Sequence, residues 1–320
     1  GNPKAALYSH RSTTLHAYAA ALPDVMCISA RDAILPVVPM FHVNAWGLPY
    51  SACLVGAKLV FPGPGLDGKS LHELFESEGV TVSAGVPTVW QGLLAHVGGN
   101  GLKFSTMRRT IIGGSACPPA MMSAFEDTYG VQVIHAWGMT ELSPIGTVGI
   151  LKGHQQTLPV EQRRAIQAKQ GRGVFGIDMK IVGEDGAELP WDGKASGELL
   201  VRGRNVFMGY LNQPEKTAET VDKDGWLHTG DVGLIDEEGY VKITDRMKDI
   251  IITAGGKNIT PSELENELKF SPYITDAVVI GDKLPYLTVI IMIDQENVEK
   301  YAQDHDVPFS NYASLTRAPE

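Results

Sequence analysis

Residues 110–135 read Thr-Ile-Ile-Gly-Gly-Ser-Ala-Cys-Pro-Pro-Ala-Met-Met-Ser-Ala-Phe-Glu-Asp-Thr-Tyr-Gly-Val-Gln-Val-Ile-His. The run begins as a short apolar strand, passes through a glycine turn, continues as a helix over 118–129 and returns to a strand over 131–135. Strand, helix and strand in this order form the unit from which parallel sheets are built. The stretch therefore predicts a layered α/β domain, in which ligands bind beyond the strand ends.

The same alternation extends toward the amino terminus. Apolar strands are predicted around residues 33–38, 58–61 and 81–84, and helices over 70–78 and 87–96. Beyond about residue 170, short β-rich runs such as Met179–Val182 and Glu198–Val201 are separated by Asp-Gly or Glu-Gly turn signals. This change of pattern predicts a hairpin-rich β subdomain over about 170–247, within a large α/β domain that spans residues 1–247.

The remaining residues, 248–320, are predicted to form a small α+β C-terminal domain. Its expected elements are a strand over 250–252, a helix over 261–269, strands over 277–280 and 287–293, and a helix over 295–304. Pro261 suits the first turn of its helix, with Thr260 as the capping residue. We expect both domains to be incomplete, because the chain starts at a glycine and ends abruptly.

Composition excludes several classes of protein. Lys and Arg number 27 against 37 Asp and Glu, so the net charge is −10. No diffuse positive field attracts nucleic acid or an anionic membrane. Three cysteines without a CxxC pair exclude a disulfide framework and a zinc ribbon, and they fit a reducing, cytoplasmic compartment. The longest apolar runs are too short for an integral membrane segment.

The stretch His135-Ala-Trp-Gly-Met-Thr-Glu141 is predicted to be a strand that enters a tight turn. One ligand could use three of its side chains. The indole of Trp137 offers a stacking face for a nucleobase, the hydroxyl of Thr140 can donate to a phosphate, and Glu141 can hold Mg²⁺ against phosphate oxygens. The alternative is a structural turn with a core tryptophan.

Three further groups could contact a nucleotide. One is a turn in which exposed N–H groups could meet a purine edge or an oxyanion; it consists of Gly113, Gly114, Ser115 and Ala116. Such turns are also common as simple connections between a strand and a helix. Asp231, after a glycine, could accept both ribose hydroxyls or cap a turn. Arg246 offers a donor fork for ribose or phosphate oxygens, and its alternative is a surface charge cluster.

In their order and spacing, these pieces resemble the AMP-forming adenylating enzymes, a superfamily of acyl-CoA synthetases, luciferases and peptide-synthetase adenylation domains. The resemblance covers essentially the whole chain, from Gly1-Asn-Pro-Lys4, which resembles the end of the superfamily's phosphate loop, to the Gly255-Gly256 segment. It implies two half-reactions: a carboxylate attacks Mg·ATP to give an acyl-adenylate, and coenzyme A then takes the acyl group.

The resemblance also implies roles for individual residues. Lys4, Thr140 and Mg²⁺ held by Glu141 surround the phosphates, while Lys248 is the pivot about which a C-terminal lid domain rotates. Glycines at 255 and 256 line the channel for the pantetheine arm. The implied adenosine contacts come from Gly113, Gly114, Ser115, Ala116, Trp137, Gly138, Met139, Asp231 and Arg246.

Two segments, 39–46 and 84–90, resemble the acyl pocket of fatty-acyl-CoA synthetases. His42 corresponds to a side chain beside the acyl carboxylate, although a lone histidine is also an ordinary core residue. The pocket residues that the resemblance implies are Phe41, His42, Asn44, Trp46, Gly85, Val86 and Trp90, and an aromatic set at this spacing is also typical of a core.

Residues 1–203 are most similar to medium-chain and 3-methylthiopropionyl-CoA ligases, whereas 204–320 are more similar to the long-chain branch. The expected substrate is thus a medium- or long-chain fatty acid or a related acid. The alternatives are a nucleotide-binding pseudo-ligase without activity, and a ligase that loads a carrier protein. The chain lacks the late C-terminal lysine of the superfamily, so we expect little activity from this portion alone, and a homodimer is possible.

Overall fold

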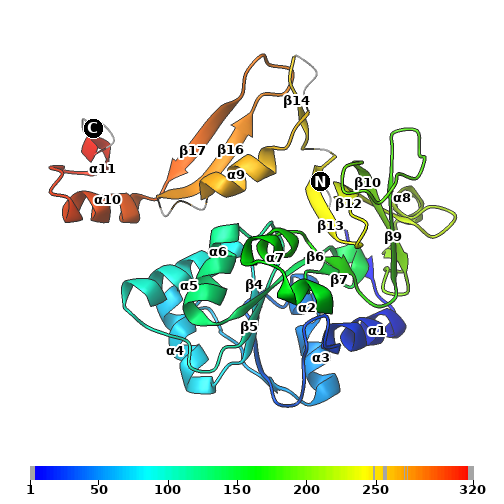
Figure 1. Cartoon of the computed structure of the whole chain (residues 1–320), viewed down its shortest axis with the longest axis horizontal. Coiled ribbons are helices and arrows are strands. Elements are labelled where there is room, and N and C mark those ends of the chain that lie inside the picture. Colours follow the sequence, from blue (N-terminus) through cyan, green and yellow to red (C-terminus); the bar gives the residue numbers. More distant parts are fainter. Residues whose placement is uncertain (1–3, 248, 255–257, 270, 272, 316–320) are drawn as a thin grey trace. The chain divides into compact units, whose positions relative to one another are not determined.

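The computed structural model describes residues 4–247, 249–254, 258–269, 271 and 273–315 (Figure 1). It divides into two compact units, Gly1–Thr244 and Asp245–Glu320. The division lies close to the expected domain boundary after residue 247, which remains a prediction.

A seven-stranded sheet organises the first unit, with strand order β3-β2-β4-β5-β6-β7-β8. The first five strands in this order are parallel, and the last two join antiparallel. This is the sheet that the strand–helix–strand unit predicts. The strands are β2 (Ala33–Pro36), β3 (Lys58–Leu59), β4 (Val82–Gly85), β5 (Arg109–Ile112), β6 (Gln132–Gly138), β7 (Ile145–Val148) and β8 (Arg172–Gly173).

Helices cover both faces of this sheet, because neighbouring residues of each buried strand point to opposite sides. Ile111 joins the core on one face and Ile112 the core on the other. The first face is covered by α1 (His10–Ala21) and α3 (Leu48–Val55), and the second by α4 (Gly68–Glu78), α5 (Pro87–Gly99) and α6 (Pro119–Ser123).

The helix predicted over residues 118–129 is not a continuous α-helix. The α-helical part, α6, ends at Ser123, and Ala124–Thr128 wind as a π-helix. Within it, Phe125 is fully buried and Glu126 accepts a hydrogen bond from the amide of Val133 at 2.9 Å. The widened turn thus serves tertiary contacts that hydrophobic spacing alone does not encode.

The β-rich subdomain is confirmed as a four-stranded sheet in the order β13-β12-β10-β9. It has its own core, in which Leu199, Val201 and Ile235 are buried. Its strands are β9 (Ile177–Val182), β10 (Gly197–Gly203), β12 (Leu227–Ile235) and β13 (Val241–Arg246). The sequence did not predict a second small sheet, in which β1 (Ala6–Leu7) pairs antiparallel with β11 (Gly209–Tyr210). Helices α7 (Val160–Gln167) and α8 (Pro214–Thr220) were also missed.

The second unit has the expected α+β character. Helix α9 (Pro261–Lys269) coincides with its predicted range, and α10 (Gln295–Asp304) with the helix predicted over 295–304. Strand β16 (Ile274–Ile280) pairs antiparallel with β17 (Thr288–Ile293). The remaining elements are β14 (Ile251–Ile252), β15 (Asn258–Ile259) and α11 (Tyr312–Leu315).

Candidate functional site

Trp137 is the second-last residue of β6. It lies at the carboxyl end of a central strand, where open α/β sheets place their ligands. Its indole is held at two points. The N–H donates to Oδ2 of Asp231 at 2.7 Å, and the six-membered ring packs on Gly146, where a Cβ atom would lie 2.4 Å from Cζ3. The side chain remains half-buried, so this ring is not the wholly enclosed core tryptophan of the alternative interpretation.

Asp231 reaches this tryptophan because β12 carries a bulge. Glu198 pairs with Val232 and Leu200 with His228, so three residues of β12 oppose one of β10. Within the bulge, Gly230 has a φ of 72°, which only glycine adopts without strain. Bulges re-aim side chains, and this one brings the carboxylate to Trp137. Asp231 is 4% exposed, so its carboxylate is largely shielded from water.

Thr140 and Glu141 form the start of a short 3₁₀ helix, Thr140–Leu142. Two tyrosines far away in the sequence fix its position. The hydroxyl of Tyr8 donates to the carbonyl oxygen of Thr140 at 2.6 Å, and the hydroxyl of Tyr210 donates to Oε1 of Glu141. The backbone N–H of Phe207 donates to the carbonyl oxygen of Glu141 at 2.8 Å.

Lys4 lies in the same neighbourhood. Its Nζ atom stands 4.8 Å from the centroid of the Tyr210 ring, a cation–π contact. The pairing of β1 with β11, in which Ala6 opposes Tyr210, brings this lysine to the tyrosine that bonds Glu141. Lys4 and Glu141 thus both contact Tyr210, although they are 137 positions apart in the sequence.

The glycine turn after β5 meets the two segments expected to form an acyl pocket. A Cβ atom on Gly113 would lie 3.3 Å from the ring of Trp46, and one on Gly114 would lie 3.1 Å from Cγ1 of Val86. The Cβ atom on Gly113 would also lie 2.9 Å from the carbonyl oxygen of Ala136. The absence of side chains in this turn is therefore required by protein packing, whatever ligand the turn contacts.

Packing also requires a glycine at position 138, whereas three other predicted residues of these segments are accessible. A Cβ atom on Gly138 would lie 2.2 Å from the carbonyl oxygen of Pro144, so glycine is needed there for the backbone to pass. Ser115 and Ala116 are exposed and Met139 is half-buried, so these residues can be reached by a ligand.

A left-handed turn follows His42. Val43, Asn44, Ala45 and Trp46 have φ values of 49°, 51°, 50° and 55°. Each such residue costs roughly 1–2 kcal/mol in an L-amino-acid chain. Ala45 and Trp46 are buried, and burial of apolar side chains opposes such a cost. Strain of this kind accumulates at functional sites more often than elsewhere.

The predicted pocket residues do not all gather in one place. Trp46 and Val86 meet at the glycine turn, as described above. Phe41 is 91% exposed, and His42 is exposed beside it. Trp90 is completely buried between Phe75 and Phe125, with ring centroids 6.4 and 6.0 Å away. Gly85 packs directly on it, since a Cβ atom there would lie 2.9 Å from Cζ2 of Trp90. For Trp90 and Gly85, the core interpretation fits the structure better than the pocket interpretation.

Two buried histidines support these loops. Nε2 of His135 accepts the backbone N–H of Cys117, at the end of the glycine turn, at 3.2 Å. Nε2 of His16 accepts the N–H of Ile145, just beyond the Trp137 motif, also at 3.2 Å. Burial lowers the pKa of each imidazole to about 4, and at His135 nearby backbone groups of residues 167–169 act in the opposite direction. Both rings are therefore neutral at pH 7 and can accept these bonds.

Four of the predicted residues cannot be related to this group of side chains. Lys248, Gly255 and Gly256 lie outside the described residues. Arg246 belongs to the second unit, where its backbone N–H donates to the carboxylate of Asp245 at 2.7 Å. Their roles remain predictions.

The site fits a magnesium ion that is bound chiefly through its nucleotide. Within the described ranges, no three or more His, Cys, Asp or Glu side chains gather as a metal-binding group. Mg²⁺ commonly uses one or two carboxylates together with substrate phosphates and water. Glu141, half-buried and oriented by Tyr210, is suited to supply such a carboxylate.

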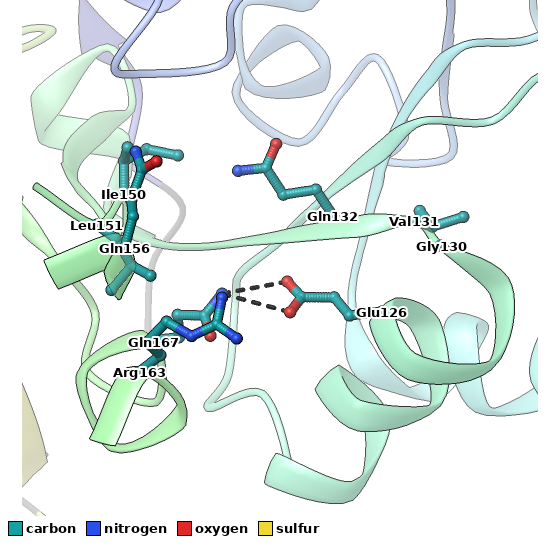
Figure 2. A pocket seen from close by; sticks show the side chains of 10 residues that line it. Glu126, Gly130, Val131, Gln132, Ile150, Leu151, Gln156, Arg163 and Gln167 are labelled. Atoms are coloured by element: carbon teal, nitrogen blue, oxygen red, sulfur yellow. Dashed lines mark hydrogen bonds between the residues drawn. The ribbon is translucent and has the colours of Figure 1, made fainter. Parts of the chain in front are cut away.

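A separate polar cavity of about 460 Å³ lies at the other end of β6 (Figure 2). Gln132, the first residue of the strand, lines it together with Glu126, Arg163 and Gln167. Gln167 donates to Oε1 of Glu126 at 3.2 Å. The residues that line this cavity include no member of the predicted site, so the cavity is distinct from the group around Trp137.

Sequence reasoning missed Tyr8 and Tyr210. Tyr8 directly follows β1 and Tyr210 lies in β11, and these two short strands pair across more than two hundred positions, which no periodicity reveals. Burial and the negative charge of Glu141 raise the pKa of both phenols, so both remain hydrogen-bond donors at neutral pH. A Gly-Tyr pair ahead of the Pro214 helix was the one local signal available.

The fold is that of an open α/β protein, a class in which ligands bind beyond the carboxyl ends of the parallel strands. The chain belongs to the AMP-binding enzyme family, whose profile matches residues 1–211. The profile of the AMP-binding enzyme C-terminal domain matches residues 248–309. The predicted family is thereby confirmed.

The similar proteins agree with this assignment. A medium-chain-fatty-acid–CoA ligase of Ectopseudomonas oleovorans is 50% identical over 93% of this chain, and a 3-methylmercaptopropionyl-CoA ligase of Ruegeria lacuscaerulensis is 47% identical over 91%. The chain spans 55% and 54% of these two relatives, so it covers about half of their length.

A solved structure confirms the fold class. ATP-bound MatB from Rhodopseudomonas palustris matches with a TM-score of 0.73 and 27% identity, over 92% of this chain and 56% of that one. In the described part of the chain, every helix is too short or too polar to cross a bilayer.

Proposed function

We propose that the protein containing this chain is an AMP-forming acyl-CoA ligase for a medium- or long-chain carboxylic acid. The bond between Trp137 and Asp231 carries the proposal, because it joins a stacking ring and a ribose-binding group from segments 94 positions apart. Membership of the AMP-binding enzyme family and the similarity to the two CoA ligases support it.

In this proposal the side chains position two anions that repel each other. Trp137 stacks on the adenine and Asp231 accepts hydrogen bonds from the ribose hydroxyls. Lys4 and Thr140 contact the phosphates, and Glu141 holds the Mg²⁺ ion, which supplies positive charge against the phosphate oxygens. Holding the carboxylate near the α-phosphorus while neutralising developing charge accounts for catalysis without a protein nucleophile.

The second half-reaction requires the thiol of coenzyme A to reach the acyl carbonyl. We assign this step to a rotation of the C-terminal domain about Lys248, after which Gly255 and Gly256 leave room for the pantetheine arm. A hinge needs only a few backbone torsions to change. Replacement of Lys248 by proline is expected to spare adenylate formation and block thioester formation.

The preferred length of the acyl chain depends on small differences in binding free energy. Each buried methylene contributes roughly 0.8 kcal/mol, so neighbouring acids differ by about tenfold or less. We place the optimum in the medium-chain range on the basis of the more similar relative. The segment from Val43 to Trp46, together with Val86, is the part of the described structure to which we assign this choice.

Acid-dependent exchange of labelled pyrophosphate into ATP tests the proposal. The full-length protein is assayed with saturated acids of four to eighteen carbons and with 3-methylthiopropionate. Exchange that peaks with a medium or long acid, followed by AMP release with coenzyme A, is the expected result. ATP binding without exchange on any acid would instead establish the pseudo-ligase, and transfer only to a phosphopantetheinyl protein would establish carrier loading.

A further inference from the structure

Tyr210 lies between two groups that act on the phosphates in the proposed function. Its hydroxyl donates to Oε1 of Glu141, and Nζ of Lys4 stands 4.8 Å from its ring centroid. Tyr210 is 7% exposed, and its ring packs edge-on against Phe207 at a centroid distance of 4.8 Å. One buried side chain thus contacts both the carboxylate and the ammonium group.

The backbone around Tyr210 is fixed as well. Its amide donates to Oγ1 of Thr217 at 2.9 Å, and Ala6 opposes it across the β1–β11 pair. The neighbouring amide of Phe207 bonds the carbonyl oxygen of Glu141 at 2.8 Å. Glu141 is therefore held by the same segment at two atoms, one on its backbone and one on its carboxylate. The backbone bond fixes the position of the residue, and the bond from Tyr210 orients its carboxylate.

We propose that Tyr210 is a positioning residue for the carboxylate that would hold magnesium. Its hydroxyl fixes one oxygen of Glu141 and leaves the other available to the metal, and its ring orients Lys4 for the same phosphates. The inference rests on the proposed function. Partners that orient a metal ligand typically contribute 10–100-fold to metal affinity or activity. The tyrosine touches neither the nucleotide nor the metal in this scheme, so its effect passes through Glu141 and Lys4.

The test uses Tyr210→Phe in the full-length protein, because this variant keeps the ring, its packing and the contact with Lys4 but removes the hydroxyl. Calorimetric titration measures the affinity for ATP in EDTA and over a range of Mg²⁺ concentrations. The expected result is an unchanged affinity in EDTA and a 10–100-fold higher half-saturating Mg²⁺ concentration. The rate of pyrophosphate exchange should shift to the same higher Mg²⁺ concentration and recover its maximum there.

Tyr240→Phe is the matched control. It deletes the same atom from a tyrosine that is 1% exposed and bonds Ile150 and Gln155, outside the site. It should lower the melting temperature and leave the Mg²⁺ dependence unchanged. A shift of similar size in both variants would show a general structural effect and overturn the positioning role.

A second variant keeps the test decisive if Tyr210→Phe does not fold. 4-Fluorophenylalanine at position 210 fills the space of the hydroxyl but cannot donate to Glu141. The half-saturating Mg²⁺ concentration should increase in this variant as it does in Tyr210→Phe.

The outcomes separate the inference from the function on which it rests. Normal Mg²⁺ dependence in both Tyr210 variants, with Glu141→Gln strongly impaired, would overturn the role of Tyr210 and leave the function standing. If the unaltered protein neither binds ATP nor exchanges pyrophosphate, the proposed function fails, and the inference fails with it.

Discussion

The indole N–H of Trp137 donates to Oδ2 of Asp231 across 2.7 Å, and the two residues come from different sheets. Strand β6 of the seven-stranded sheet carries the tryptophan, and the bulge in β12 of the subdomain carries the aspartate. The bond therefore ties the α/β layer to the β-rich subdomain at the point where we place the adenosine. In the proposed function, the bond makes stacking of Trp137 on the base and binding of the ribose by Asp231 interdependent.

Trp137→Phe should weaken ATP binding, because phenylalanine keeps a stacking face but cannot donate to Asp231. The bond is present in the protein without ATP, so its loss acts on binding by leaving Asp231 less well placed for the ribose, and the dissociation constant for ATP should rise by roughly tenfold. Calorimetry with ATP and 3′-deoxy-ATP measures both the loss and the reduced preference for an intact ribose. Trp191→Phe, at an exposed position, is the control and should bind ATP normally. Wild-type affinity in Trp137→Phe would contradict this role for the bond.

Glu141→Gln should reduce the rate of pyrophosphate exchange by roughly 100-fold, the usual size of a lost charge-stabilising contact. Glutamine keeps the shape and can still accept from Tyr210, but it loses the charge that attracts Mg²⁺. Affinity for ATP in EDTA should be unchanged or higher, because a negative charge beside the phosphates is removed. Titration of the exchange rate with Mg²⁺ checks the prediction, and an unaltered Mg²⁺ curve would exclude Glu141 as the metal ligand.

Acid should destabilise the protein through His16 and His135. Burial lowers the pKa of both to about 4, below the value near 6.5 expected in the unfolded chain. The unfolded state therefore takes up protons first, and the stability that each neutral ring contributes is lost as pH falls from about 6.5 to 4. When the pH is lowered from 7 to 5, protonation linked to each histidine should reduce the free energy of unfolding by about 2 kcal/mol.

Urea unfolding at pH 7 and pH 5 measures this loss. His16→Gln and His135→Gln retain an acceptor that does not titrate, so each should reduce the difference between the two pH values. His154→Gln, at an exposed position, should leave the difference unchanged. If the double variant kept the full dependence on pH, other groups would be responsible.

Val43→Asn should stabilise the protein by about 0.5–1 kcal/mol, which is part of the roughly 1–2 kcal/mol that a left-handed conformation costs. A β-branched residue at a φ of 49° is strained, whereas asparagine enters the left-handed region more readily. Val160→Asn removes an exposed valine and should have less effect. Urea unfolding compares the two variants, and a loss of stability in Val43→Asn would show that packing outweighs strain at this position. A changed acyl-chain preference in the same variant would connect the turn with substrate choice.

Local sequence patterns predicted those elements whose stability depends on near neighbours. The strand–turn–helix–strand unit of residues 110–135 and helix α9 are of this kind, since apolar spacing and a proline at the first turn are visible in a short window. The same window could not show the π-helical turn at Ala124–Thr128, because contacts of Phe125 and Glu126 with other segments accompany it.

The sequence by itself determined the family, the layered α/β architecture and the identity of Trp137, Glu141 and Asp231 as candidates, because their types and order follow a pattern along the chain. Only the tertiary structure decided that Trp90 is a core residue, that Phe41 is exposed, and that Tyr210 joins Lys4 to Glu141. The physical reason is that burial and hydrogen bonding between distant segments depend on which strands pair and in what register. A linear pattern of residues does not contain that information.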